Sequence, residues 1–255
     1  MLWGLAGRGA EMSISRRGRQ AIARALRLDL THAQCRYARV LRSYVEGASR
    51  WLEVGCGRQV LPSWAMPLEE QRQMVSRASL FVGIDPCPAI REHPLLREKV
   101  IALAGALPFK EGSFDLVTAN MVLEHAREPA EFLADVRRVL KPGGKFLFHT
   151  PNYFYYLTFL ASLVPDGLKR RIVQILEQRR EEDVWPACYR ANTPGRIREL
   201  AEHCKLHVEL LSVVGSAGSF GRLWALGWLE CVPLKVVSVL GGGKYGSNLM
   251  VVLRR

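Results

Sequence analysis

Short apolar runs alternate with segments of helical periodicity from residue 31 onward. The strand-like runs are 51–54, 80–84, 99–103, 115–119, 145–150, 206–214 and 247–253. Apolar runs of this length, separated by helices, are typical of parallel strands that are buried on both faces. The pattern therefore predicts an α/β fold built on a doubly wound sheet with helices on both faces.

Helix signals are clearest between the runs 115–119 and 145–150. Pro129 stands in the first turn, and Glu128 and Glu131 place acids near the start. The apolar residues at helical spacing are Phe132, Leu133, Val136, Val139 and Leu140. The sequence Lys-Pro-Gly-Gly at 141–144 predicts a helix stop. Further helices are predicted over 31–46 and from Thr193-Pro194 onward.

The character of the chain changes after Asn152. An aromatic-rich apolar stretch covers 153–164, a basic and helical segment covers 168–182, and another apolar segment covers 220–240. With no repeat and no low-complexity linker, we expect residues 1–30 to form a poorly packed leader and residues 31–255 to form a single domain.

The net charge of +12 would suit nucleic acid, an anionic membrane surface or an acidic substrate. The arginines are nevertheless spread along the chain without a dense basic run interleaved with aromatics, so a nucleic-acid partner is not favoured. The six cysteines form no Cys-x-x-Cys pair and the six histidines lack ligand spacing, so we expect neither a metal site nor a disulfide framework and take the cytoplasm as the default location. The nearest candidate for a membrane span, 223–240, is interrupted by Glu230, Pro233 and Lys235.

Polar residues follow three of the predicted strands. Glu53, Asp85 and Asn120 each stand at or just past a carboxyl end, and ligands of open parallel sheets bind beyond these ends. Gly55 and Gly57 follow Glu53 and would let the backbone approach a ligand closely. These residues predict a ligand site at the carboxyl edge of the sheet.

The glycine pattern is incomplete for a dinucleotide site, because Val60 stands where the third glycine would be. A carboxylate two residues before the first glycine suits a cation better than a pyrophosphate. S-adenosylmethionine carries an amine, a sulfonium and a ribose but no phosphate, and Asp85 suits ribose hydroxyls because a carboxylate accepts two hydrogen bonds.

The segments WLEVGCG, VGIDP and ALPFKEGSFDLVTANMVLEHAREPAEFLADVRRVLKPGGKFLFHTPN resemble successive motifs of class I S-adenosylmethionine-dependent methyltransferases. The branch they resemble most is the bacterial small-molecule type related to ubiquinone and menaquinone methyltransferases. This resemblance implies a Rossmann-like sheet of seven strands with the last antiparallel, a cofactor-binding half at 31–152 and an acceptor side at 153–255.

By the same resemblance, Glu53, Gly55 and Gly57 line the methionine end of the cofactor, and Asp85 binds its ribose. The full set of expected cofactor-binding residues is Glu53, Gly55, Cys56, Gly57, Asp85, Pro86, Ala104, Gly105, Ala106 and Asn120. Transfer would be an in-line displacement in which alignment supplies most of the catalysis.

Two positions depart from the family pattern. Arg58-Gln59 replace a small residue and a glycine, and Leu103 stands where an acid would contact adenine. Adenine would then be held by backbone groups and apolar contacts around 104–106. These departures leave a non-catalytic, methyltransferase-like binding module open as an alternative.

His125 is the candidate catalytic residue, since a histidine there could take a proton near neutral pH. A structural hydrogen-bonding role for the Glu124-His125 pair is the stronger alternative, and His149 is expected to be a core residue. Cys56 and Cys87 lack an activating partner.

We expect the acceptor to be a small molecule of lipophilic character, reached by peripheral contact with a membrane. Apolar segments 153–164 and 223–240 lie beside basic residues such as Lys169 and Arg170, as in proteins that dock on anionic lipid. The same segments could instead be helices that cover the sheet. An RNA methyltransferase, supported by charge alone, and a nicotinamide enzyme remain as further alternatives, and the oligomeric state stays open.

Overall fold

The computed structural model describes residues 31–155, 158–159, 185–215 and 246–255. The predicted leader 1–30, the basic segment 168–182, the whole apolar segment 220–240 and part of the stretch 153–164 lie outside the described residues. Among the described residues, no helix is long and apolar enough to cross a membrane.

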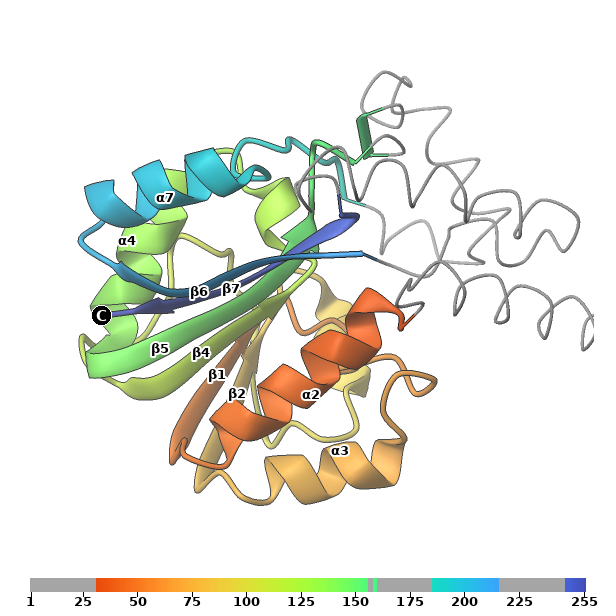
Figure 1. Ribbon diagram of the computed structural model, residues 1–255. Coiled ribbons are helices and arrows are strands. Elements are labelled where there is room, and N and C mark those ends of the chain that lie inside the picture. Colours follow the sequence, from red (N-terminus) through yellow and green to blue (C-terminus); the bar gives the residue numbers. More distant parts are fainter. Residues whose placement is uncertain (1–30, 156–157, 160–184, 216–245) are drawn as a thin grey trace, which may run out of the picture.

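The described residues form a seven-stranded sheet in the order β3-β2-β1-β4-β5-β7-β6 (Figure 1). The strands are β1 (Arg50–Val54), β2 (Leu80–Ile84), β3 (Glu98–Val100), β4 (Phe114–Asn120), β5 (Leu140–Pro151), β6 (His207–Val214) and β7 (Asn248–Arg254). The last strand, β7, pairs antiparallel with both of its neighbours, and the remaining pairs are parallel. The predicted Rossmann-like sheet is confirmed, and its strand order reverses between β1 and β4, where such folds bind ligands.

Helices cover both faces of this sheet, as predicted (Figure 1). On one face lie α2 (Ala33–Val45) and α3 (Leu68–Val75), and on the other lie α4 (Pro129–Val139) and α7 (Pro194–His203). Two short 3₁₀ turns, η1 (Pro88–Glu92) and η2 (Leu123–His125), follow β2 and β4. Helix α3 was not expected from the apolar pattern, because it is short and mostly polar.

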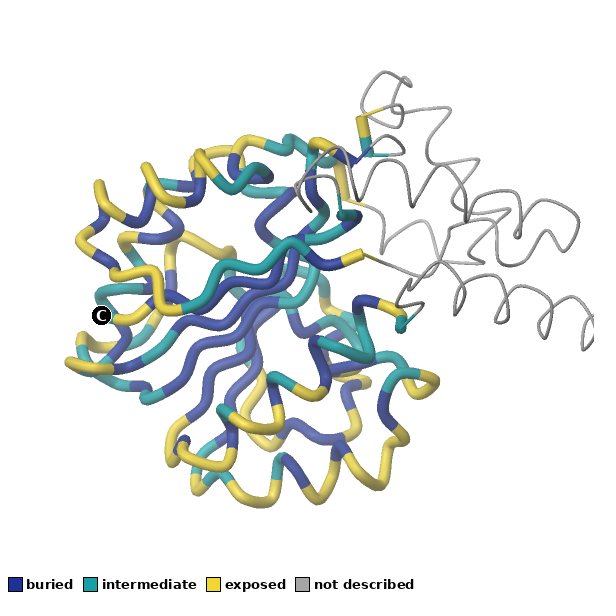
Figure 2. The backbone as a smooth tube through the Cα atoms, viewed as in Figure 1, coloured by how far each residue is buried: buried dark blue, intermediate teal, exposed yellow. Residues whose placement is uncertain are grey.

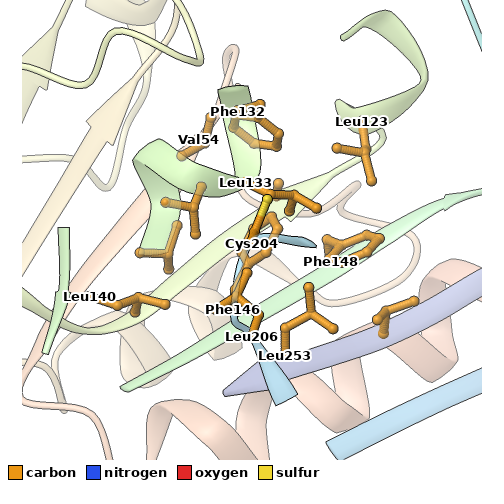
Figure 3. Packing of buried hydrophobic residues seen from close by; sticks show 14 of the residues in the cluster. Val54, Leu123, Phe132, Leu133, Leu140, Phe146, Phe148, Cys204, Leu206 and Leu253 are labelled. Atoms are coloured by element: carbon orange, nitrogen blue, oxygen red, sulfur yellow. The ribbon is translucent and has the colours of Figure 1, made fainter. Parts of the chain in front are cut away.

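Alternate residues of each central strand point to opposite faces, and each face has its own buried cluster. Figure 2 shows the central strands buried along their length, with exposure concentrated on the outer sides of the helices and on loops. On the α4 side, Phe132 packs edge-on against Phe146, which stacks with Phe148 (Figure 3). On the α2 side, Trp51 packs on Phe81. These two layers hold the loops at the carboxyl edge in fixed positions.

The region 140–144 differs from the prediction. Helix α4 ends at Val139 and Leu140 is already extended, so Lys-Pro-Gly-Gly belongs to an irregular start of β5 and not to a helix stop. Gly143 has φ of 78° and donates its N–H to the Arg255 carbonyl, which closes this bulge against the end of β7. The predicted strand 99–103 is also shorter, because pairing with β2 ends at Val100.

Candidate active site

The loop after β1 is held against the ends of β1 and β2 by backbone hydrogen bonds. The Gly55 and Cys56 N–H groups both donate to the Ile84 carbonyl, at 2.8 and 3.2 Å. Gly55 and Gly57 have φ of 67° and 49°, a region that side chains disfavour. A Cβ on Gly57 would meet no atom within 4 Å, so its outer surface is open at the carboxyl edge of the sheet.

Asp85 links this loop to the one after β2. One carboxylate oxygen accepts from the Gly57 N–H and the other from the Cys87 N–H, both at 2.8 Å. Each oxygen keeps a further lone pair that could accept from a ligand hydroxyl. Asp85 is therefore both a fixed part of the loop structure and a candidate ligand group.

Glu53 is buried beneath the same loop, with 1% of its surface exposed. Its neighbours in the sheet are Gly83 on β2 and Thr118 on β4, and the Thr118 hydroxyl donates to its carboxylate. The Trp51 indole N–H in turn donates to the Thr118 oxygen at 2.6 Å. Burial raises the pKa of Glu53 to about 8, and the Thr118 hydrogen bond opposes this only in part.

Two further polar atoms are buried on the α2 face. Tyr37 on α2 stacks on His149 of β5, with ring centroids 5.4 Å apart. The Tyr37 hydroxyl and His149 Nε2 find no hydrogen-bond partner among the residues that the structure describes. Burial lowers the pKa of His149 to about 3, so this ring is neutral at physiological pH. His149 occupies the core position that was expected for it, but only one of its two ring nitrogens, Nδ1, has a hydrogen-bond partner among the described residues.

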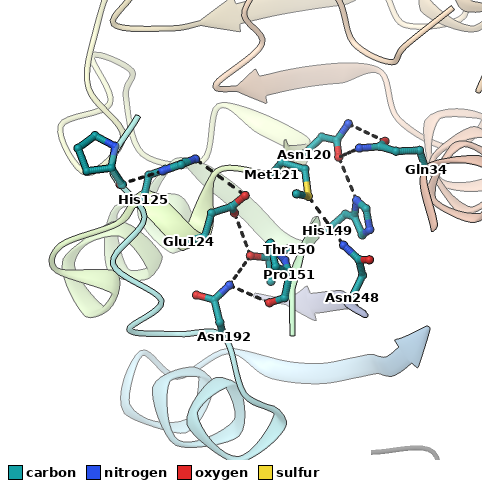
Figure 4. A network of polar contacts seen from close by, with 11 residues as sticks. Gln34, Asn120, Met121, Glu124, His125, His149, Thr150, Pro151, Asn192 and Asn248 are labelled. Atoms are coloured by element: carbon teal, nitrogen blue, oxygen red, sulfur yellow. Dashed lines mark hydrogen bonds and ion pairs between the residues drawn. The ribbon is translucent and has the colours of Figure 1, made fainter. Parts of the chain in front are cut away.

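Asn120, expected to contact the cofactor, is paired within the protein (Figure 4). Its amide exchanges two hydrogen bonds with the Gln34 amide on α2, at 3.0 and 3.2 Å, and its oxygen lies 3.1 Å from His149 Nδ1. This arrangement ties the first turn of α2 to the ends of β4 and β5. As the structure stands, Asn120 positions α2 above the sheet.

The two departures from the family pattern have distinct surroundings. The Arg58 guanidinium forms an ion pair with Glu92 in η1, so it braces the glycine loop from the side. Leu103 is 62% exposed, and the turn Ala104-Gly105-Ala106 beside it is exposed as well, with Gly105 at φ of 99°. This turn offers backbone groups and apolar surface near the end of β3.

His125 contacts the segment after residue 185 (Figure 4). Its Nδ1 lies 2.9 Å from the Pro186 carbonyl oxygen and therefore carries the proton, while its Nε2 lies 3.9 Å from the Glu124 carboxylate. Glu124 accepts from the Thr150 hydroxyl, which accepts from the Asn192 amide. This network joins η2, β5 and the segment before α7.

Three residues at this site, Tyr37, Thr118 and Gln34, were not among those expected from the sequence. Thr118 could have been found, because it stands two residues before Asn120 and shares its face of β4. Tyr37 and Gln34 could not, because the position of a helix over a sheet is not encoded in local spacing.

Comparison with known proteins agrees with this geometry. Residues 52–148 match the sequence model of the family described as "Methyltransferase domain". By this match, residues 52–148 form a methyltransferase domain of class I. S-adenosylmethionine is the cofactor of this class, and the residues present fit it: the buried Glu53 carboxylate has no cationic partner among the described side chains, and Gly57 leaves space at the loop.

The curated relatives align with only part of this chain. A ubiquinone biosynthesis O-methyltransferase from Burkholderia multivorans is 26% identical over 126 residues, which cover 46% of this chain and 54% of that protein. An uncharacterized 37.1 kDa protein of transposon TN4556 from Streptomyces fradiae is 30% identical over 109 residues, 40% of this chain and 30% of that one. The chain thus matches about half or less of the length of these relatives.

Solved structures share the fold of the methyltransferase domain. A methyltransferase from Archaeoglobus fulgidus superimposes with a TM-score of 0.55 at 14% identity, covering 91% of this chain and 97% of that one. One from Mesorhizobium loti gives a TM-score of 0.52 at 18% identity, covering 85% and 96%. At this identity the likeness establishes the fold alone.

Proposed function

We propose that this protein transfers a methyl group from S-adenosylmethionine to a small acceptor. The observation that carries the proposal is the buried Glu53 carboxylate beneath a glycine loop that is open at Gly57. Among the described residues, no arginine or lysine forms an ion pair with Glu53. The site therefore offers a carboxyl group that can pair with a cationic ligand in an environment with little solvent, where such an interaction is strong.

Each residue of the loop has a role in this proposal. Glu53 binds the ammonium group of the methionine end, and the Gly55-Cys56-Gly57 backbone lies along it. Asp85, followed by Pro86, accepts hydrogen bonds from the ribose hydroxyls while it holds Gly57 in place. The exposed turn 104–106 lies against the adenine ring.

The cofactor supplies a methyl group that is already activated by its sulfonium. The protein then has to align the acceptor, exclude water and remove a proton where the acceptor arrives protonated. His125 donates to a backbone carbonyl and lies beside a carboxylate. We therefore assign His125 to holding the segment 185–192 in position, and not to proton abstraction.

The acceptor we propose is a lipophilic small molecule. Support comes from the name of the Burkholderia relatives, which act in ubiquinone biosynthesis, and from exposed aromatic residues that follow β5, where Phe154 and Phe159 are 50% and 46% exposed. Methyl transfer to short-chain catechols and quinols, followed by mass spectrometry, tests this acceptor class. If the protein binds the cofactor but methylates none of them, the acceptor class is wrong.

Cofactor binding itself can be tested with two matched glycine variants. Gly57→Ala and Gly112→Ala both place a side chain at positive φ, 49° and 64°, where no atom lies within 4 Å. Gly57 follows β1 and Gly112 precedes β4, so the two lie at opposite edges of the sheet. We expect Gly57→Ala alone to weaken S-adenosylhomocysteine binding, by at least tenfold, in calorimetry. Equal affinities for the two variants would place the cofactor elsewhere.

A further inference from the structure

Among the residues that the structure describes, none places a positive charge beside Glu53 that could stabilise an ionised carboxylate. Its neighbours in the sheet are Gly83 and Thr118. The Thr118 hydroxyl is the group that donates a hydrogen bond to the Glu53 carboxylate in the described part of the chain. Since ionised carboxylates in a dry interior need a cationic partner or several donors, one hydroxyl leaves the charged form poorly stabilised.

The described titratable groups that face this region are neutral or acidic. They are Tyr37 on α2, Cys56 in the glycine loop, Asp85 at the end of β2 and His149 on β5, with His32 at the start of α2. The nearby cation is Lys99, which acts on Cys56 and donates to the Arg91 carbonyl, and it forms no ion pair with Glu53. With no partner for it in the described part of the chain, the charge that balances Glu53 comes from a proton or from a ligand.

We propose that Glu53 exchanges its proton for the ammonium group of the bound cofactor. In the free protein the carboxyl group is protonated. When the ligand's ammonium group arrives, the carboxyl O–H bond breaks, the proton leaves to solvent, and the carboxylate pairs with the ammonium group. This inference rests on the proposed function, since it takes the ligand to be an S-adenosyl amino acid.

Proton exchange makes cofactor affinity depend on pH in a definite direction. Below the raised pKa of Glu53, about 8, the free protein holds a proton that the complex lacks. Affinity should then rise about tenfold per pH unit between pH 6 and 7.5, as expected for the release of one proton.

Isothermal titration calorimetry tests this exchange directly. S-adenosylhomocysteine, which keeps the ammonium group but lacks the sulfonium, is titrated at pH 6.5 in two buffers with different heats of ionisation. We expect the difference in heat to correspond to about one proton released per ligand bound. The same titration with 5′-methylthioadenosine, which lacks the amino-acid end, should release none.

The Glu53→Gln variant is the control on the protein side. It keeps the hydrogen bond from Thr118 but has no proton to release, so its affinity for S-adenosylhomocysteine should not change between pH 6 and 7.5. If wild-type protein binds S-adenosylhomocysteine without releasing a proton, or releases one with 5′-methylthioadenosine, the exchange is wrong while the proposed function stands. If it binds neither ligand at any pH, both fail. If Glu53→Gln does not fold, the two wild-type titrations still decide.

Discussion

Replacing Gly55 with alanine should reveal how tightly the glycine loop is packed. At φ of 67° an alanine is strained, which costs about 1–2 kcal/mol. Its Cβ would also lie 2.4 Å from Cγ2 of Val122, in the turn after β4. Relief of such an overlap costs about 1–3 kcal/mol more. Gly55→Ala should therefore lower the free energy of unfolding by about 2–5 kcal/mol.

The neighbouring glycine separates the two contributions. Gly57→Ala has a similar backbone strain at φ of 49° but meets no atom within 4 Å, so it should cost about 1–2 kcal/mol. Urea denaturation of both variants measures the difference. The sequence alone suggested that Gly55 lets the backbone approach a ligand closely, whereas the structure shows that a side chain at Gly55 would first collide with Val122.

A double-mutant cycle tests whether Val122 is the cause. Val122→Ala removes both γ-carbons and leaves its Cβ at 3.4 Å, which is ordinary contact. In this background Gly55→Ala should cost only the backbone strain, so the coupling energy should be about 1–3 kcal/mol. If Gly55→Ala costs the same with and without Val122→Ala, or no more than Gly57→Ala, the packing argument is refuted.

Three further variants test other parts of the site. Asp85→Ala should lower the free energy of unfolding by about 1.5–3 kcal/mol, because two backbone N–H groups lose a charged acceptor. It should also weaken S-adenosylhomocysteine binding. Chemical denaturation measures the first effect and calorimetry the second, and an unchanged affinity would show that Asp85 does not belong to the ligand site. Glu53→Gln should stabilise the protein relative to wild type more at pH 9 than at pH 5, because the pKa of Glu53 rises from 4.5 in the unfolded protein to about 8 in the folded protein. The contribution of Glu53 to the stability of the wild type is fully present below pH 4.5 and is lost as the pH rises through 8, by about 2–5 kcal/mol. Urea titrations at the two pH values that give the same difference would contradict this. Gly143 has φ of 78°, and a Cβ there would meet no atom within 4 Å. Gly143→Ala should therefore lower the free energy of unfolding by about 1–2 kcal/mol and leave cofactor affinity unchanged, since Gly143 lies at the amino end of β5. Melting curves and calorimetry check the two effects, and a loss of affinity would mean that this bulge reaches the ligand site.

The sequence by itself determined the sheet. Each predicted run contains a strand. The central strands β1, β2, β4, β5 and β7 are mostly buried between two layers of helices, as their apolar residues require, whereas the edge strands β3 and β6 are largely exposed or half-buried. Local chemistry also fixed the ends of some elements: Thr193 caps α7 by accepting from the Arg196 N–H, and Pro129 begins α4. The position of Glu53 and Asp85 at carboxyl ends followed from strand boundaries alone, since parallel strands share one edge.

Tertiary structure decided which polar groups face one another. Only the packing of α2 on the sheet brings Tyr37 over His149 and pairs Gln34 with Asn120, and no local pattern fixes the position of a helix over strands that are distant in sequence. The same holds for Gly143, where the nearby end of β7 turns an apparent helix stop into a bulge. Burial also raises the pKa of Glu53, because a carboxyl group's pKa depends on the solvent and charges that surround it in three dimensions.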